Sequence, residues 1–230
     1  MPMTPMVSGG HAGEPRELPG PIETGALLVI DVQRGFGDPA FMSDSVGASD
    51  RAEIEAAVDR MIELVDHARR TGLKVIWVTG GAADRLPPWR SLFWLKGKGD
   101  DPEFEGFKIT EEGKASGEFY RVKPNPGELH VKKGRYSAFE GSDIEEVLRR
   151  EGVDWVITSG LTTECCVGST SWDAVQRGFR VIVAGDAAAC QEKSMHDAAL
   201  RIMAHNVGLI VSVDELGTAL TEQAAAAAVA

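Results

Sequence analysis

The chain has 230 residues, of which 43% are hydrophobic and 26% charged, and its 24 basic and 35 acidic side chains give a formal net charge of −11. Its apolar and aromatic content excludes a mainly disordered chain, no apolar run approaches the ~20 residues that span a bilayer, and the negative charge argues against a nucleic-acid partner. Three cysteines, two of them adjacent, make no disulfide framework and the N-terminal residues show no secretory signal, so we expect a cytoplasmic protein that binds neither nucleic acid nor membrane.

The two ends of the chain differ in composition from the region between them. Residues 1–23 are rich in Pro, Gly and Met without periodicity, which predicts a flexible N-terminal arm, and residues 221–230 form an Ala-rich, helix-prone tail. Between them, residues 24–220 contain no internal repeat and no Gly/Ser linker. We therefore expect a single domain over residues 24–220.

Short apolar runs alternate with segments of helical periodicity along this domain. The predicted strands cover residues 26–31, 73–79, 128–133, 154–160, 179–185 and 208–212. The predicted helices cover residues 50–72, 142–150, 165–178 and 194–205, with a short helix from Asp214; Ser142 and Glu145 fit a capping box at the start of the second. Val/Ile-rich strands alternating with helices predict an α/β fold in which helices cover both faces of a parallel sheet.

Residues 80–127 interrupt this alternation with Gly, Pro, charged residues and the aromatic residues Trp89, Phe93 and Trp94. So long an irregular segment in a compact domain is more often functional than idle. The two tryptophans are candidates for a substrate lid, although packing aromatics would give the same pattern.

Three polar groups stand at the ends of predicted strands: Asp31 closes the first strand, Lys133 closes the third, and the Cys165–Cys166 pair follows the fourth. Because the carboxyl ends of parallel strands meet at one edge of the sheet, we expect these groups to lie together. A cysteine between a strand and a helix lies near the helix N-terminus, where backbone N–H groups favour a thiolate, and a nearby Lys133 would lower the thiol pKa further. The same N–H groups can hold the oxyanion of a tetrahedral intermediate.

Each of these residues also has a structural interpretation. Unpaired cysteines are among the most buried residue types, and Asp31 could cap a helix or serve another α/β chemistry. A phosphatase of the haloacid-dehalogenase type would need a second Asp where this chain has Gln33, and the chain has no glycine-rich phosphate loop. Lys132 and Lys133 point to opposite faces of an extended strand, so only one of them can face the site.

Taken together, four segments resemble the isochorismatase-like cysteine hydrolase family. They are LLVIDVQRGF (27–36), KKGRYSAFEGSDIEEVL (132–148), TSGLTTECCVGSTSWDA (158–174) and VIVAGDA (181–187). They follow the family's order, and the resemblance covers about residues 25–215. It implies a doubly wound sheet of six parallel strands in the order 3-2-1-4-5-6.

The resemblance also implies roles for residues. Cys166 is the nucleophile, Lys133 rather than Lys132 is the supporting lysine, and Asp31 is the acid–base carboxylate. It implies a cis peptide bond between Leu161 and Thr162, and an oxyanion hole formed by the backbone N–H groups of Thr162 and Cys166.

The resemblance also bears on whether the protein binds a metal and on which of the family's reactions it catalyses. Related nicotinamidases bind a metal through an Asp and His cluster after the first strand. Here His67, in a predicted helix, is the only histidine between Asp31 and Arg90, so we expect no metal and no other cofactor. Members that cleave the vinyl ether of isochorismate lack the cysteine, so Cys166 points away from that reaction.

These expectations combine into a cysteine-dependent hydrolase of a small amide, ureido or carbamoyl compound, acting through a thioester-type intermediate. A non-catalytic metabolite- or protein-binding member of the fold and an ester or ether hydrolase remain as alternatives. The candidate pocket wall consists of Gln33, Phe36, Trp89, Trp94 and Tyr136. Family members are usually oligomers, so we expect a homo-oligomer, either a dimer or a tetramer.

Overall fold

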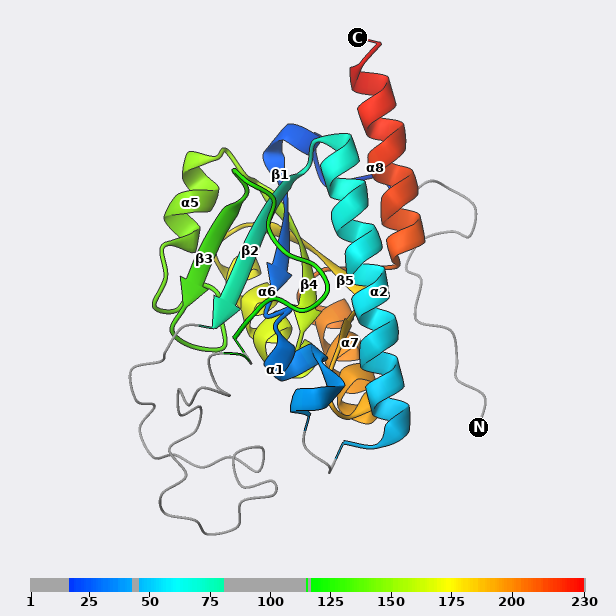
Figure 1. The fold of residues 1–230 in the computed structure, drawn as a ribbon. Coiled ribbons are helices and arrows are strands. Elements are labelled where there is room, and N and C mark those ends of the chain that lie inside the picture. The colour runs from blue at the N-terminus through cyan, green and yellow to red at the C-terminus, as the bar shows by residue number, and fades with distance from the viewer. Residues whose placement is uncertain (1–16, 43–45, 81–114, 116, 230) are drawn as a thin grey trace.

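Six parallel strands form one sheet in the order β3-β2-β1-β4-β5-β6 (Figure 1). The computed structural model describes residues 17–42, 46–80, 115 and 117–229. The strands are β1 Gly25–Ile30, β2 Lys74–Gly80, β3 Leu129–Lys133, β4 Trp155–Leu161, β5 Arg180–Ala189 and β6 Leu209–Val211. The predicted sheet topology is therefore confirmed, and the arrowheads in Figure 1 point to a common edge.

Helices cover both faces of the sheet, as predicted. The longer helices are α2 Ala48–Thr71, α5 Ile144–Arg150, α6 Gly168–Gln176, α7 Lys193–Asn206 and α8 Val213–Ala227. Helices α2 and α8 lie side by side over one face, and α5, α6 and α7 contribute to the core on the other (Figure 1). Short elements that the sequence did not predict are η1 Ile22–Thr24, α1 Arg34–Gly37, η2 Pro39–Phe41 and the π-helical turn Thr163–Val167.

Strand β1 lies at the centre of the sheet and is buried along its whole length. Leu27 and Val29 pack into the core beneath α2 and α8, whereas Leu28 and Ile30 pack into the opposite core. This alternation follows from the two-residue period of a strand, and each fully buried side chain of this size contributes roughly 1.5–3 kcal/mol. The end of β1 is therefore a firmly held position in the fold.

Gly160 allows β4 to approach the end of β1 closely. Its φ is +123°, and a Cβ atom built on it would lie 1.9 Å from the carbonyl oxygen of Ile30. Only glycine fits such a backbone approach. The contact places the last residues of β4 directly beside the end of β1.

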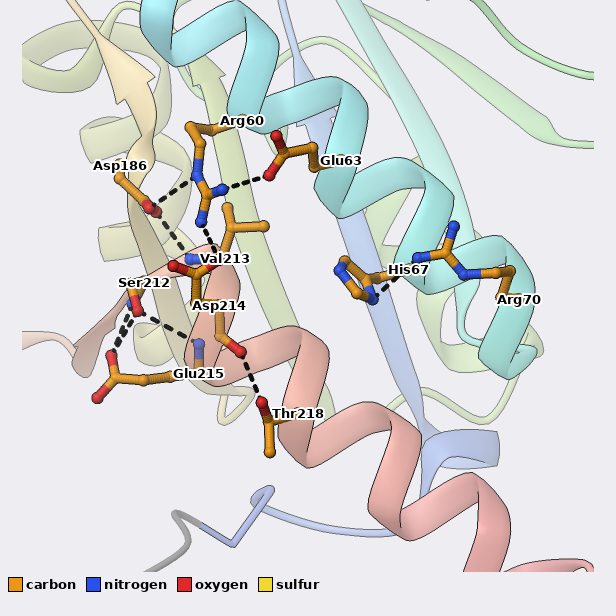
Figure 2. A network of polar contacts seen from close by, with 10 residues as sticks. All are labelled: Arg60, Glu63, His67, Arg70, Asp186, Ser212, Val213, Asp214, Glu215 and Thr218. Atoms are coloured by element: carbon orange, nitrogen blue, oxygen red, sulfur yellow. Dashed lines mark hydrogen bonds and ion pairs between the residues drawn. The ribbon is translucent and has the colours of Figure 1, made fainter. Parts of the chain in front are cut away.

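The capping box forms at a different helix from the one that the sequence predicts. The capping box expected at Ser142 and Glu145 is wrong: α5 begins at Ile144 after Asp143, and Glu145 Oε2 instead accepts from Arg177 Nε at 3.1 Å. A capping box does form at α8, between Ser212 and Glu215 (Figure 2).

Both predicted tails contain ordered residues. Helix α8 continues past residue 220 to Ala227, so the expected boundary at 220/221 falls inside a helix. At the other end, Leu18 and Ile22 of the predicted arm pack against the core.

Arg60 links α2 to two segments far along the chain (Figure 2). Its Nε lies 3.1 Å from Asp186 Oδ2 in β5, its Nη2 lies 2.7 Å from Asp214 Oδ1 in α8, and it also pairs with Glu63. Asp186 Oδ1 accepts the backbone N–H of Val213 at 2.9 Å. Asp186 therefore stabilises the start of α8.

Candidate active site

Three predicted site residues meet at the carboxyl edge of the sheet. Asp31 follows β1, Lys133 is the last residue of β3, and Cys166 lies in the turn Thr163–Val167 after β4. Their exposed fractions are 0%, 4% and 5%. The backbone of Asp31 has a φ of +50°, and its N–H donates to Val78 O at 2.8 Å, which fixes the turn that carries the carboxylate.

Lys133 contacts both of the other groups. Its Nζ lies 2.8 Å from Asp31 Oδ2 and donates to Cys166 Sγ at 3.3 Å. A third bond, of 3.0 Å, goes to the carbonyl oxygen of Arg135. The neighbouring Lys132 is exposed, as strand alternation requires.

Burial governs the charge state of the carboxylate and the ammonium. Burial raises the pKa of Asp31, and the Lys133 charge together with hydrogen bonds from Cys166, Lys133 and Gly80 only partly opposes it. Burial acts to lower the pKa of Lys133, but the Asp31 carboxylate and the Cys166 sulfur raise it, with a net upward direction. Lys133 is therefore the permanent positive charge of the site.

The predicted lowering of the Cys166 thiol pKa is wrong. A hydrogen bond with Cys165 raises that pKa first, burial and the Asp31 charge raise it further, and only Lys133 acts to lower it. The helix terminus and Lys133 favour a thiolate, but the adjacent Cys165 thiol, burial and the Asp31 carboxylate outweigh them. The resting site thus holds a protonated thiol beside an ion pair.

The peptide bond between Leu161 and Thr162 is cis, as the resemblance implied. Thr162 is 7% exposed, and its carbonyl oxygen accepts the N–H groups of Cys165 at 3.2 Å and Val167 at 3.1 Å. The role of the Thr162 and Cys166 N–H groups as an oxyanion hole stays a prediction.

The proposed wall residues fall into three groups. Gln33 is buried, and both ends of its amide are engaged: Oε1 accepts from Gly80 N at 3.2 Å and Nε2 donates to Gly117 O at 2.7 Å. Phe36 is half-buried against the core, while Tyr136 is 39% exposed. Trp89 and Trp94 lie outside the described residues.

The sequence analysis missed a contact beneath the Thr163–Val167 turn. Thr163 Oγ1 lies 2.8 Å from Nδ1 of His196 in α7. The two residues are far apart in the chain and belong to no common motif. Only the packing of α7 against the turn brings them together.

The described part of the chain shows neither a clustered set of metal ligands nor a helix suited to a membrane. Among these residues no group of three or more His, Cys, Asp or Glu side chains is placed to hold a metal ion. None of the helices in the described ranges combines the length and apolar character needed to cross a bilayer.

Comparison with known proteins adds a family match and several relatives. A family model described as the isochorismatase domain matches residues 25–215. The ureidoacrylate amidohydrolase RutB of Caulobacter segnis is 31% identical over 185 residues, which cover 75% of this chain and 76% of that protein.

Two solved structures show the same fold at lower identity. The cysteine hydrolase from Pseudomonas syringae pv. phaseolicola has a TM-score of 0.68 and 21% identity, over 92% of this chain and 99% of its own. The N-carbamoylsarcosine amidase from Thermoplasma acidophilum has a TM-score of 0.60 and 24% identity, over 83% of this chain and 97% of its own. At these identities the likeness establishes the fold alone.

Proposed function

Because this chain belongs to the isochorismatase family, we propose that it is a cysteine-dependent amidohydrolase of small amide, ureido or carbamoyl compounds, working through a thioester-type intermediate and without a metal. The observation that carries the proposal is the pair of contacts that Lys133 makes, 2.8 Å to Asp31 and 3.3 Å to Cys166, in a buried site. The ureidoacrylate amidohydrolases at about 30% identity support the choice of the C–N bond.

The first half of the reaction forms the covalent intermediate. As Cys166 Sγ attacks the substrate carbonyl carbon, its proton passes to Asp31, whose raised pKa makes it a suitable acceptor. This transfer leaves the net charge of the site unchanged, because the negative charge moves from one partner of Lys133 to the other. The backbone N–H groups of Thr162 and Cys166 then bind the oxyanion, and Asp31 returns the proton to the departing nitrogen.

The second half releases the product. Water attacks the thioester carbonyl while Asp31 takes one of its protons, and the C–S bond breaks as the tetrahedral intermediate collapses. Asp31 then returns the proton to Cys166, which restores the resting thiol. For a carbamoyl substrate the released acid is a carbamate, which loses carbon dioxide to give ammonia or an amine.

The test measures ammonia or amine release from a panel of small ureido, carbamoyl and amide compounds. We expect turnover by the natural chain and a loss of at least about 10³-fold in the Cys166→Ala and Lys133→Met variants. Lys132→Met is the matched control, because it removes an exposed lysine from the neighbouring position of the same strand. Quenched mixtures should show an acyl or carbamoyl mass on the peptide that contains Cys166.

The outcomes separate the alternatives left open by the sequence. Binding of panel compounds without turnover in the natural chain would indicate a non-catalytic member of the fold. Turnover of esters or ethers with no C–N cleavage would indicate the other hydrolase class. Equal activity of Lys133→Met and Lys132→Met would refute the assigned role of Lys133.

We also propose that the protein is a cytoplasmic homo-oligomer. The unpaired thiols Cys165, Cys166 and Cys190 suit a reducing compartment. In the single chain, three large apolar side chains on α6 and α7 are exposed to solvent. Their exposed fractions are 37% for Trp172, 47% for Met195 and 54% for Ile202. Contact between copies of the chain would remove such side chains from water.

A further inference from the structure

One hydrogen bond joins the turn that carries Cys166 to helix α7. Thr163, the first residue of that turn, is fully buried, and its Oγ1 lies 2.8 Å from Nδ1 of His196. A hydroxyl buried this deeply needs a partner, and the imidazole is the side chain that supplies it. The bond therefore links the turn to an element outside the strand-end cluster.

The backbone of the same turn determines where Cys166 lies. The carbonyl oxygen of Thr162 accepts the N–H groups of Cys165 and Val167, the residues on either side of Cys166. The carbonyl oxygen of Thr163 accepts the N–H of Gly168 at the start of α6. A rotation at Thr163 would therefore shift Sγ away from Lys133 Nζ, 3.3 Å distant.

Helix α7 is a fixed anchor for this bond. Its first N–H group, that of Lys193, donates to Asp50 Oδ1 in α2 at 3.1 Å. Further along the helix, Leu200 and Met203 are buried in the core. His196 lies between these two attachments, so its imidazole is presented from a backbone held at both sides.

The environment of His196 keeps its ring neutral. Burial lowers the pKa of His196 and the nearby Lys193 charge lowers it further, against the opposing charges of Asp197 and Glu53. In one tautomer of the neutral imidazole, Nδ1–H donates to the Thr163 hydroxyl oxygen, and in the other the hydroxyl donates to Nδ1. The hydrogen bond therefore forms with either tautomer.

His196 lines a cavity that does not include the reacting groups. The cavity, of about 210 Å³, lies between α2, β5 and α7, and none of Asp31, Lys133 and Cys166 lines it. The hydrogen bond to Thr163 is the contact that joins His196 to the turn of Cys166.

We propose that His196 is a positioning residue of the hydrolase: through Thr163 it holds the Thr163–Val167 turn in the arrangement that keeps Cys166 against Lys133 and Asp31. The inference rests on the proposed function and adds to it a residue that touches neither substrate nor reacting atoms.

The test compares kcat, KM and thermal stability of His196→Leu, Thr163→Val and the double variant. Small misplacement of a reacting group can cost up to about 10²-fold, so we expect each single variant to lose at least about tenfold in kcat with KM within about twofold. The double variant should be no worse than the poorer single variant, because both remove the same bond.

Two further variants of the same residue sharpen the comparison. An asparagine amide can reach the position of Nδ1, whereas a glutamine amide reaches that of Nε2. His196→Asn should keep kcat within about threefold of the natural chain and His196→Gln should not. His205→Leu is the matched control, since His205 is exposed in the last turn of the same helix.

Alkylation of Cys166 by iodoacetamide, followed by mass spectrometry of its peptide, gives a readout independent of substrate. His196→Leu should change this rate by about threefold or more and His205→Leu should not. Unchanged kcat in His196→Leu, multiplied losses in the double variant, or equal losses in His196→Asn and His196→Leu would overturn the proposal. If the natural chain turns over no compound of the panel, the proposed function fails, and the alkylation rates alone decide whether His196 positions Cys166.

Discussion

At the residue scale, the site places one mobile proton between Asp31 and Cys166 next to a lysine that stays charged. Asp31 is more basic than an ordinary aspartate because it is buried, and Cys166 is less acidic than an ordinary cysteine because of Cys165, burial and Asp31. Both shifts keep the proton on sulfur at rest and ready Asp31 to receive it. In the proposed mechanism, charge therefore develops on sulfur only during attack on the substrate.

The pH dependence of kcat/KM tests this arrangement. The proposed mechanism requires the ionised form of Asp31, so activity should fall as the pH drops through the pKa of Asp31, which burial raises above the ordinary value of about 3.9. The contribution of Asp31 to stability has the opposite pH dependence: a carboxyl whose pKa is raised by folding favours the fold below its unfolded pKa, and that contribution is lost as the pH rises through the folded value. An acid limb at or below pH ~4 in a kcat/KM profile would contradict the assignment.

Gly160 predicts a large stability loss from a single methyl group. In Gly160→Ala the new Cβ would lie 1.9 Å from Ile30 O, so β1 and β4 must separate, and we expect the free energy of unfolding to fall by at least about 3 kcal/mol. Gly152→Ala is the control, because Gly152 also has a positive φ but nothing lies within 4 Å of the added atom. It should lose only about 1–2 kcal/mol. Equal losses in urea unfolding would show that the contact between β1 and β4 is not the cause.

At the element scale, the local Ser-x-x-Glu pattern predicts only in part whether a capping box forms at the start of a helix. Ser142 and Glu145 have the spacing of a capping box, but Glu145 is bound by Arg177 of α6's C-terminal end instead. Ser212 and Glu215 have the same spacing, and there the box forms. The same local pattern therefore gives a capping box at one helix and an ion pair with another helix at the other.

The start of α8 gives a prediction at this scale. Ser212→Ala removes the side chain that accepts the Glu215 N–H, and loss of a cap typically costs about 1 kcal/mol in the free energy of unfolding. Thr218→Ala is the control, since Thr218 only bonds back to the Asp214 carbonyl on the exposed surface and should change stability by less than about 0.5 kcal/mol. Chemical denaturation that gives the same loss for both variants would show that the box contributes nothing.

The elements that sequence predicts well are the buried strands. Strands β1, β2 and β4 lie between helical layers, and each contains a continuous run of apolar residues, so they can be predicted without knowledge of their neighbours. The π-helical turn and α1 were not predicted, because they are shorter than any periodicity and are set by the chain reversals after β4 and β1.

At the scale of the whole molecule, the topology explains why three distant residues could be predicted to meet. A parallel sheet collects the ends of β1, β3 and β4 at one edge, so Asp31, Lys133 and Cys166 follow from strand order. The Cys165 effect on the thiol and the Thr163–His196 bond could not be predicted, because each depends on side-chain packing. The family resemblance, rather than spacing, selected Lys133 over Lys132.

Oligomerisation is the prediction that belongs to this scale. We expect light scattering on the purified protein to give two or four times the chain mass of 24.7 kDa. The reason is that contact between copies would bury the exposed apolar side chains on α6 and α7, which is favourable. Trp172→Glu, on α6, should lower that mass at micromolar concentration, while Arg201→Glu, at an exposed position on α7, tests whether added charge alone has the same effect. A mass equal to one chain in the natural protein would refute the expectation.

The bonding of Lys133 has a consequence for inhibitor design. Its ammonium has three N–H groups, and Asp31, Cys166 and the carbonyl of Arg135 already take one each. A compound bearing an acceptor aimed at this nitrogen must displace a native partner and gains little affinity. Aldehydes and nitriles, which become tetrahedral or trigonal adducts on sulfur, leave the ammonium undisturbed, and they are the better starting points for blocking this enzyme.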